Sequence, residues 1–330
     1  MNQHKNIFIL LCVSAFLFVV ACNPPTNQQN NGGTGESTIS GGTGESAISG
    51  EIYITVDENF RPILDSEITV FQHLYPKAKI HPVYLPGEEA IKRMLKSDTF
   101  RLAIASRNLS KEEEDYLKSQ KTKNRPMPIA KDAIALIAHK DNPDSVLTTE
   151  QYRGVLTGKI TQWKQINPSS KLGDIMLVYD DKRSGTLTFI KDSILKNEKL
   201  NEKAYTANGS PEVLGYLGKN PAAMGIIGIN WVSDSDDKKA TGFLQNVKIM
   251  GIESTPDCKW TSKFIKPYQG LIKANCYPLS RYMYSLNRET GFLLGTGFVS
   301  FLCNGENGQR VILKAGLVPI YAVTRNVRIN

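Results

Sequence analysis

The apolar residues that follow Gly50 recur at two alternating spacings. Short β-branched and aliphatic runs predict strands at residues 52–56, 80–84 and 102–105. Between these runs, apolar side chains three or four positions apart predict helices, and Ser110 with Glu113 has the spacing of a capping box. This β-α-β-α-β order indicates an α/β fold with a mostly parallel sheet, which would bind ligands at the carboxyl ends of its strands.

The alternation continues beyond residue 128, where it predicts a second α/β lobe. Its strands are expected at residues 134–138, 175–179 and 224–229. Thr148 and Gln151 have capping-box spacing, and Gly158 is placed to end the helix that they begin. Residues 247–252 read as a strand that returns to the first lobe. We therefore predict a first lobe of residues 50–127 and 240–330 and a second of residues 128–239.

The first residues have the pattern of an export signal. Lys5 precedes an apolar run at residues 7–20, and the small residue Ala21 stands before Cys22. The run is shorter than the ~20 residues of a membrane-spanning helix. The junction resembles the lipobox of bacterial lipoproteins, which predicts removal of residues 1–21 as a signal peptide and lipid attachment to Cys22. The alternative is ordinary secretion with Cys22 as a bystander.

Residues 22–49 are rich in Asn, Gln, Gly, Ser and Thr, and they contain a tandem repeat at 32–40 and 41–49. This composition buries too little apolar surface to offset the entropy of ordering. We predict a flexible tether between the lipid and the folded protein.

The formal charge of +8 becomes +7 when residues 1–21, with the single charge of Lys5, are removed (8 − 1). A basic balance favours anionic partners, but the basic residues are scattered and no nucleic-acid module is present, so nucleic acid is not expected. In an exported chain Cys258 and Cys276, which flank a loop-like stretch, are the expected disulfide pair, and Cys303 reads as a packed apolar side chain. No spacing of metal ligands is present, so no metal site is expected.

The segment Arg183-Ser184-Gly185-Thr186 stands between an apolar run and a helix-like stretch. This placement puts backbone N–H groups and hydroxyls at the start of a helix, which suits phosphate or sulfate.

Several stretches, taken in order, resemble the periplasmic phosphate-binding proteins of ABC transporters. They are residues 132–137, 142–143, 147–151, 156–163, 184–186, 221–226, 277–281 and 308–319. The resemblance implies a type II periplasmic-binding-protein fold, with two α/β lobes that are joined by crossover hinge segments and close on an oxyanion. It also implies delivery of phosphate to an ABC permease, a monomer, no cofactor and a lipid-anchored place in the cell envelope, on the periplasmic or cell-surface side of a bacterial membrane.

The family takes its ligand contacts from three loops, and these map onto nine residues here. The predicted ligand residues are Asp57, Glu58, Asn59, Ser106, Arg107, Arg183, Ser184, Gly185 and Thr186. The first loop departs from the family's Gly-Ser/Thr pattern, and Asp180 stands where many members carry Arg. For Arg107 the alternative is a surface salt bridge with Glu112 or Glu113, and for Arg183 it is a solvated side chain.

Nothing in the sequence indicates an enzyme, because Ser184 lies outside a Gly-x-Ser-x-Gly turn and no histidine has a visible catalytic partner. Two functions remain. The first is capture of phosphate or a related oxyanion for transport. The alternative is a surface lipoprotein that keeps the fold as a sensing or interaction module, and the acidic first loop with Asp180 favours it.

Overall fold

A computed structural model describes residues 44–196, 198–259 and 262–323. The predicted signal peptide, the lipidation site Cys22 and most of the predicted tether lie outside these ranges. In the described part of the chain, no helix has both the length and the apolar composition needed to cross a membrane.

A ten-stranded sheet runs through the protein in the order β2-β1-β3-β12-β4-β8-β6-β7, with β13 and β9 also paired to β4. Its first half confirms the predicted β-α-β-α-β unit. This half contains β1 (Gly50–Asp57), α1 (Arg61–Leu74), β2 (Ala78–Leu85), α2 (Gly87–Lys96) and β3 (Phe100–Ala105), and both neighbours of β1 pair with it in parallel.

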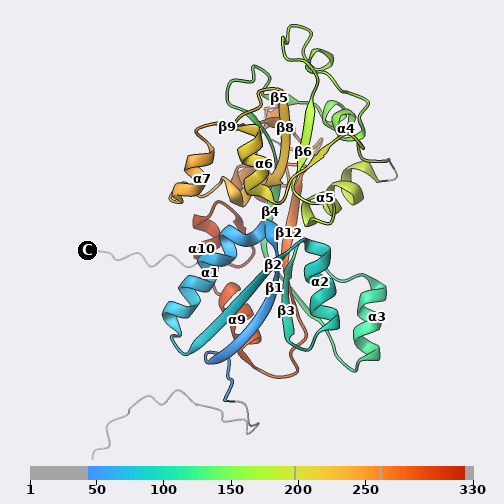
Figure 1. The fold of residues 1–330 in the computed structure, drawn as a ribbon. Helices are drawn as coiled ribbons and strands as arrows, with labels where there is room; N and C mark the ends of the chain where they lie inside the picture. The colour runs from blue at the N-terminus through green and yellow to red at the C-terminus, as the bar shows by residue number, and fades with distance from the viewer. Residues whose placement is uncertain (1–43, 197, 260–261, 324–330) are drawn as a thin grey trace, which may run out of the picture. The chain divides into compact units, whose positions relative to one another are not determined.

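One long strand, β4, pairs with strands of both halves of the sheet. β4 (Arg125–His139) pairs in antiparallel fashion with β12 (Ser280–Asn287) on one edge and with β8 (Ala223–Gly228) on the other. Figure 1 shows β4 and β12 running from the β1–β3 group toward the β6–β8 group. The predicted boundary at residue 128 therefore falls within one continuous strand. The division into two lobes remains a prediction.

The second half is again parallel, since β6 (Met176–Tyr179) pairs with both β8 and β7 (Tyr205–Thr206). Its helices include α4 (Thr149–Thr157), which has the predicted Thr148/Gln151 capping box and ends at Gly158 with φ of 75°. Helix α5 (Gly185–Phe189) continues into a π-helical turn (Ile190–Leu195), and α6 (Ser210–Leu217) follows β7.

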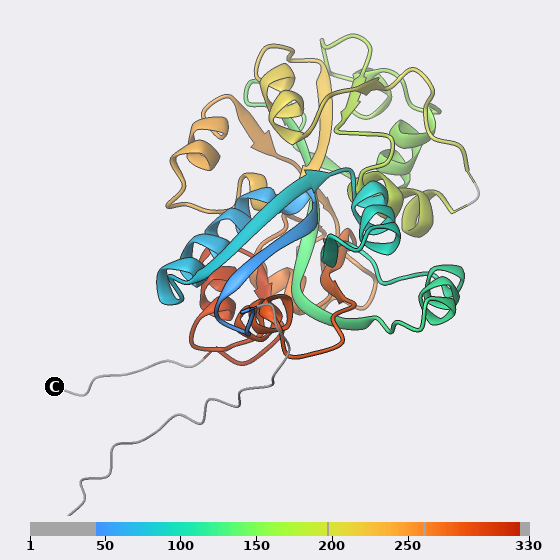
Figure 2. The ribbon, with the colours of Figure 1, turned by 60° about the horizontal axis from the view of Figure 1, so that its bottom comes forward.

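The remaining helices and strands flank this sheet, except that β9 and β13 belong to it. They are α3 (Lys111–Ser119), β5 (Val146–Leu147), α7 (Lys238–Phe243), β9 (Val247–Ile249), β10 (Gly251–Glu253), β11 (Phe264–Ile265), α8 (Gln269–Lys273), α9 (Leu294–Leu302), α10 (Gly308–Lys314) and β13 (Val318–Pro319). Figure 2 shows α2 and α3 on the opposite side of the first half of the sheet from α1 and α10. A small apolar cluster lies under α2 and α3, and the main core fills the rest of the protein.

The strand predicted at residues 247–252 was placed wrongly. It is divided, with β9 paired to the end of β4 and β10 paired to β5 in a separate three-stranded sheet. Both partners belong to the segment that was assigned to the second lobe. The chain returns to the first half only with β12. The prediction failed because the apolar run at 247–252 does not specify which strand it pairs with.

The end of the predicted tether packs against the folded body. The carboxylate of Glu45 pairs with Arg101 and accepts a 3.3 Å hydrogen bond from the backbone N–H of Leu294, at the start of α9. Ser46 and Ser49 form a β-bridge just before β1. Residues 44–49 are therefore an ordered extension of β1 rather than a free spacer.

The expected disulfide between Cys258 and Cys276 is present. It closes the loop that follows β10. Cys303, at the end of α9, is half-buried as a free thiol, and burial raises its pKa.

Candidate functional site

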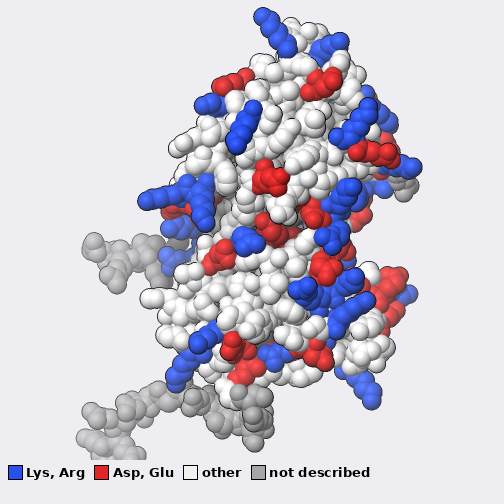
Figure 3. Space-filling view, in the orientation of Figure 1, with Lys and Arg blue, Asp and Glu red and all other residues white. Residues whose placement is uncertain are grey.

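The carboxyl ends of β1, β6 and β7 meet at a cavity of about 240 Å³. Its lining residues are Asp57, Glu58, Asn59, Arg61, Tyr84, Leu85, Pro86, Asp180, Asp181, Ser184, Asn208 and Gly209. Figure 3 shows acidic side chains at mid-height of the face drawn, where the two halves of the sheet meet. The sequence prediction of a site at the strand ends is consistent with this position.

Four of the nine predicted ligand residues line the cavity, namely Asp57, Glu58, Asn59 and Ser184. Three more lie directly behind it. Ser106 and Gly185 contact the Asp57 carboxylate, and Thr186 is fully buried against Asn59.

Asn59 joins the two sides of the site. Its Nδ2 donates a 3.1 Å hydrogen bond to Oδ1 of Asp57, and its Oδ1 accepts a 2.7 Å hydrogen bond from the hydroxyl of Thr186. Its backbone carbonyl accepts a 2.7 Å hydrogen bond from Nδ2 of Asn230, which follows β8. A short 3-10 turn after β1, capped by Asp57, presents Asn59 to all three partners.

Two buried carboxyl groups, Asp57 and Asp180, and the partly buried carboxyl of Glu58 give the site its electrostatic character. Burial and, second, the nearby charge of Asp180 together raise the pKa of Glu58 to about 7. Burial also raises the pKa of Asp180 to about 6, against the opposing effect of the Ser184 hydroxyl. The pKa of Asp57 is raised by burial as well, while the charge of Arg281 works in the opposite direction. Near neutral pH, Glu58 and Asp180 can therefore either donate or accept a hydrogen bond.

Arg61 supplies the cavity lining with a positive charge that the sequence analysis did not assign. Its guanidinium stacks over the Tyr84 ring at 3.9 Å from the centroid, and its Nε lies 4.0 Å from Oε1 of Glu58. The signal was available, because Arg61 begins α1 immediately after the predicted ligand loop.

A buried ion pair stands behind the cavity. Nε of Arg281 on β12 donates a 3.0 Å hydrogen bond to Oδ2 of Asp132 on β4, and both side chains are almost fully buried. The two terminal nitrogens of Arg281 have no hydrogen-bond partner within the described ranges. The stretch containing Arg281 contributed to the family resemblance, but its sequence gives no sign of this partner.

Two predicted ligand residues turn away from the cavity. Arg107 forms ion pairs with Glu88 at 2.7 Å and with Glu113 at 2.8 Å, so the salt-bridge alternative with Glu113 is correct. Arg183 is 61% exposed and its Nε lies 3.4 Å from Oδ1 of Asp181 at the surface. Arg107 is drawn to two carboxylates of its own half, and Arg183 extends into solvent from a turn that Asp181 stabilises.

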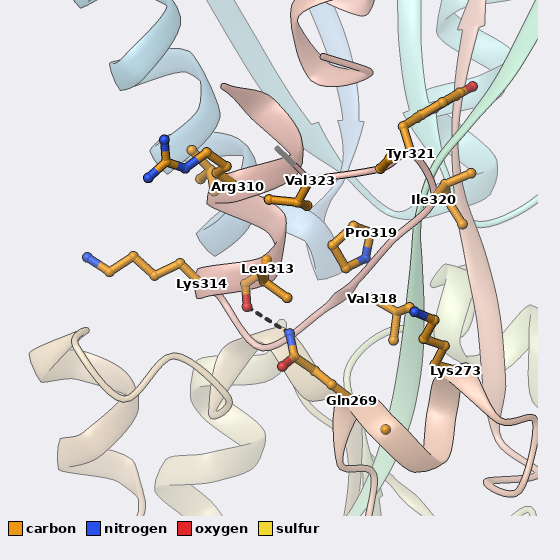
Figure 4. A pocket seen from close by; sticks show the side chains of 13 residues that line it. Gln269, Lys273, Arg310, Leu313, Lys314, Val318, Pro319, Ile320, Tyr321 and Val323 are labelled. Carbon is orange, nitrogen blue, oxygen red and sulfur yellow. Dashed lines mark hydrogen bonds between the residues drawn. The ribbon is translucent and has the colours of Figure 1, made fainter. Parts of the chain in front are cut away.

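A larger groove of about 870 Å³ lies elsewhere, between α8, α10 and the segment that follows β13. Figure 4 shows Gln269, whose Nε2 donates to the backbone carbonyl of Leu313 and so ties α8 to α10. The floor is aliphatic and contains none of the predicted ligand residues. In the described ranges, no cluster of three or more His, Cys, Asp or Glu side chains is arranged to hold a metal ion.

The family model of the PBP superfamily domain matches residues 41–306, which is most of the chain. The chain belongs to this superfamily. Its mixed α/β sheet, in which β4 joins the two halves, is the type II form of the superfamily fold, and the predicted fold is confirmed.

Curated relatives include the phosphate-binding protein PstS of Staphylococcus saprophyticus, which is 28% identical over 200 residues, or 60% of this chain and 58% of the relative. PstS of Staphylococcus aureus strain RF122 is 28% identical over 184 residues, or 55% of this chain and 51% of the relative. The match thus spans little more than half the length of each relative.

Solved structures share the fold. A Clostridium perfringens protein, crystallised with bound phosphate, has a TM-score of 0.67 at 23% identity, with 82% of this chain and 100% of that chain covered. An ABC-type phosphate transport receptor of Vibrio cholerae has a TM-score of 0.59 at 22% identity, with the same coverage.

Proposed function

We propose that this member of the PBP superfamily is an extracytoplasmic solute-binding protein that captures phosphate, or a closely related protonated oxyanion, for an ABC permease. The fold family and the names of the PstS relatives support capture and transport. We further propose that the chain is held at the membrane by lipid on Cys22 and acts as a monomer without catalysis.

The observation that carries the ligand class is the pairing of Arg61 and Ser184 with ionisable carboxyls in one cavity. A guanidinium and a hydroxyl donate hydrogen bonds to an oxyanion. A carboxyl whose pKa lies near neutrality can accept the ligand's own proton or donate one of its own, and the pKa values of Glu58 and Asp180, about 7 and about 6, satisfy this condition. Phosphate carries a proton at neutral pH, whereas sulfate does not.

Calorimetry on the purified protein with phosphate and with sulfate tests the proposal. We expect phosphate to bind and sulfate to bind far more weakly. Phosphate affinity should rise as the pH falls from 8 to 6, because protonation of Glu58 and Asp180 removes negative charge from the cavity. Absence of phosphate binding across this pH range would reject the proposal.

Two arginine variants form a matched pair. Arg61→Gln removes a cation from the cavity lining, whereas Arg183→Gln removes a cation from the nearby surface. A charge-assisted hydrogen bond contributes about 1.5–3 kcal/mol, so we expect Arg61→Gln to weaken phosphate roughly tenfold or more. Arg183→Gln should bind phosphate like the wild type. Equal effects of the two changes would point to general attraction by the protein's charge.

The acidic lining supports a second candidate, a sensing or interaction module that does not capture phosphate. Glu58 and Asp180 repel each other and raise each other's cost of ionisation, which disfavours a dianion. The same calorimetry decides between the two candidates.

A further inference from the structure

The Asp57 carboxylate lies in an unusually confined space at the end of β1. A Cβ atom built on Gly185 would lie 2.0 Å from Oδ2 of Asp57 and 2.2 Å from Oγ of Ser106. A Cβ built on Gly87 would lie 2.7 Å from the same Oδ2 and 2.9 Å from the backbone nitrogen of Gly185. Two glycines, at the starts of α2 and α5, therefore leave just enough room for this one carboxylate oxygen.

The space between Gly87, Ser106 and Gly185, here called the seat, has the chemistry of an anion site. It adjoins the first turn of the ten-residue helix α2, whose positive end attracts negative charge, although the N–H of Glu88 already donates a 3.3 Å hydrogen bond to the carbonyl of Arg183. The Ser106 hydroxyl, beside Asp57, adds a donor. These are the surroundings that one oxygen of a tetrahedral oxyanion would require.

Oδ2 of Asp57 fills this space, where the nearby Ser106 hydroxyl favours its charged form. Oδ1 accepts both hydrogen bonds from Asn59, through its backbone N–H at 3.2 Å and its Nδ2 at 3.1 Å. Oδ2 is buried and has no hydrogen-bond partner within the described ranges. A buried oxygen without a hydrogen bond destabilises the folded state. Another interaction or a function must therefore account for the position of Oδ2 at the seat.

The charges that surround Asp57 do not supply that reason. Asp132, Asp180 and Glu58 are all close enough to repel it, and the charge of Arg281 attracts it. Arg281 already pairs with Asp132.

We infer that Asp57 is a built-in competitor that occupies the seat of an incoming oxyanion, and so lowers affinity by exclusion instead of contributing a contact to the ligand. The inference rests on the proposed function and reverses the role expected for Asp57. A bound oxyanion must either displace the Asp57 carboxylate or bind beside it, against Arg61 and Ser184.

The test compares phosphate binding by the full-length wild-type protein, Asp57→Ser and Asp57→Asn, using calorimetry with inorganic phosphate. Serine vacates the seat, whereas asparagine keeps its shape and removes only the charge. We expect Asp57→Ser to bind phosphate about tenfold or more tightly than the wild type, since one added charge-assisted contact has that effect. Asp57→Asn should gain much less.

A second variant tests whether the higher phosphate affinity of Asp57→Ser comes from the emptied seat or from a change in protein stability. Gly87→Ala in the Asp57→Ser background places a methyl group 2.9 Å from the backbone nitrogen of Gly185, in the emptied space. Gly87→Ala should abolish the gain in phosphate affinity while the near-ultraviolet circular dichroism spectrum stays that of the native protein. A gain that survives Gly87→Ala would overturn the inference.

The outcomes also distinguish this inference from the proposed function. Phosphate binding by the wild type with weaker binding by Asp57→Ser would uphold the function and overturn the inference. Binding by Asp57→Ser alone would uphold the inference and reject capture by the natural protein. Absence of binding by every variant would reject both.

Discussion

The hydroxyl of Thr186 donates a 2.7 Å hydrogen bond to Oδ1 of Asn59, although the two residues lie 127 positions apart. Both side chains are buried, and they connect the loop after β1 to the first turn of α5. The contact ties the two halves of the sheet together at the site.

Replacing Thr186 with Val keeps the shape of the side chain and removes the donor. Oδ1 of Asn59 then loses this hydrogen bond in a buried position, which costs about 1–3 kcal/mol. We expect the free energy of unfolding, measured in urea, to fall by that amount. Thr188→Val, on the more exposed side of the same helix, is the control and should change it by less than about 0.5 kcal/mol. Equal losses for the two variants would assign the effect to helix propensity.

The stability of the protein should decrease as the pH rises from about 4 to 8. Glu58 and Asp180 have folded-state pKa values of about 7 and about 6, above their ordinary values of 4.5 and 3.8. The folded state therefore binds more protons than the unfolded state in this interval, and each carboxyl removes up to roughly 3 kcal/mol once it is ionised.

The variants Glu58→Gln and Asp180→Asn should flatten this decline, as measured by chemical unfolding at several pH values. Asp181→Asn alters a carboxylate of the same cavity lining that is 33% exposed, and it serves as the more exposed control. If the unfolding free energy of Glu58→Gln and Asp180→Asn falls with pH as steeply as that of the wild type, these two carboxyls do not cause the decline.

The buried pair Asp132 and Arg281 should show strong coupling. Arg281→Met leaves the Asp132 carboxylate buried without its cation, and Asp132→Asn leaves the guanidinium without its anion. Each single change should cost about 3–5 kcal/mol of unfolding free energy. The double variant should recover part of this loss, and a double-mutant cycle measures the coupling. Additive losses would show that the pair contributes no mutual stabilisation.

Arg107→Gln should reduce stability without altering phosphate binding. The side chain joins Glu88 of α2 to Glu113 of α3, so its loss removes two partly buried ion pairs at a cost of about 1–2 kcal/mol. Calorimetry should give the wild-type phosphate affinity. A large loss of affinity would restore Arg107 to the ligand set.

Local patterns were sufficient to predict the first β-α-β-α-β unit and several helix ends. The capping boxes at Ser110 and Thr148 and the helix end at Gly158 are where the sequence places them, because these signals act within a few residues. The length of β4 was missed, because Pro126 and Pro128 interrupt its apolar pattern and Lys131 with Asp132 reads as a polar break. The residues that pair with this part of β4 lie about 150 positions further along the chain, on β12 and later strands. Local periodicity contains no information about such distant partners.

A cavity lies where the sequence places the site, and its role in binding stays a prediction. Strand ends locate Asp57, Glu58 and Ser184 because parallel topology brings them to one edge. The direction of Arg107 depends on Glu88, which belongs to a different helix, and the confinement of Asp57 depends on Gly87 and Gly185 together. Such relations arise from packing between distant segments and have no signature within one segment.

The insertion of β12 between β3 and β4 has a consequence for synthesis of the chain. β3 and β4 are complete by residue 139, but the strand that pairs with both of them ends only at residue 287. A chain that emerges from its N-terminus must carry two unpaired strand edges until most of it has been made, and such edges invite association with other chains. The sheet can therefore be completed only after the last third of the sequence has been made.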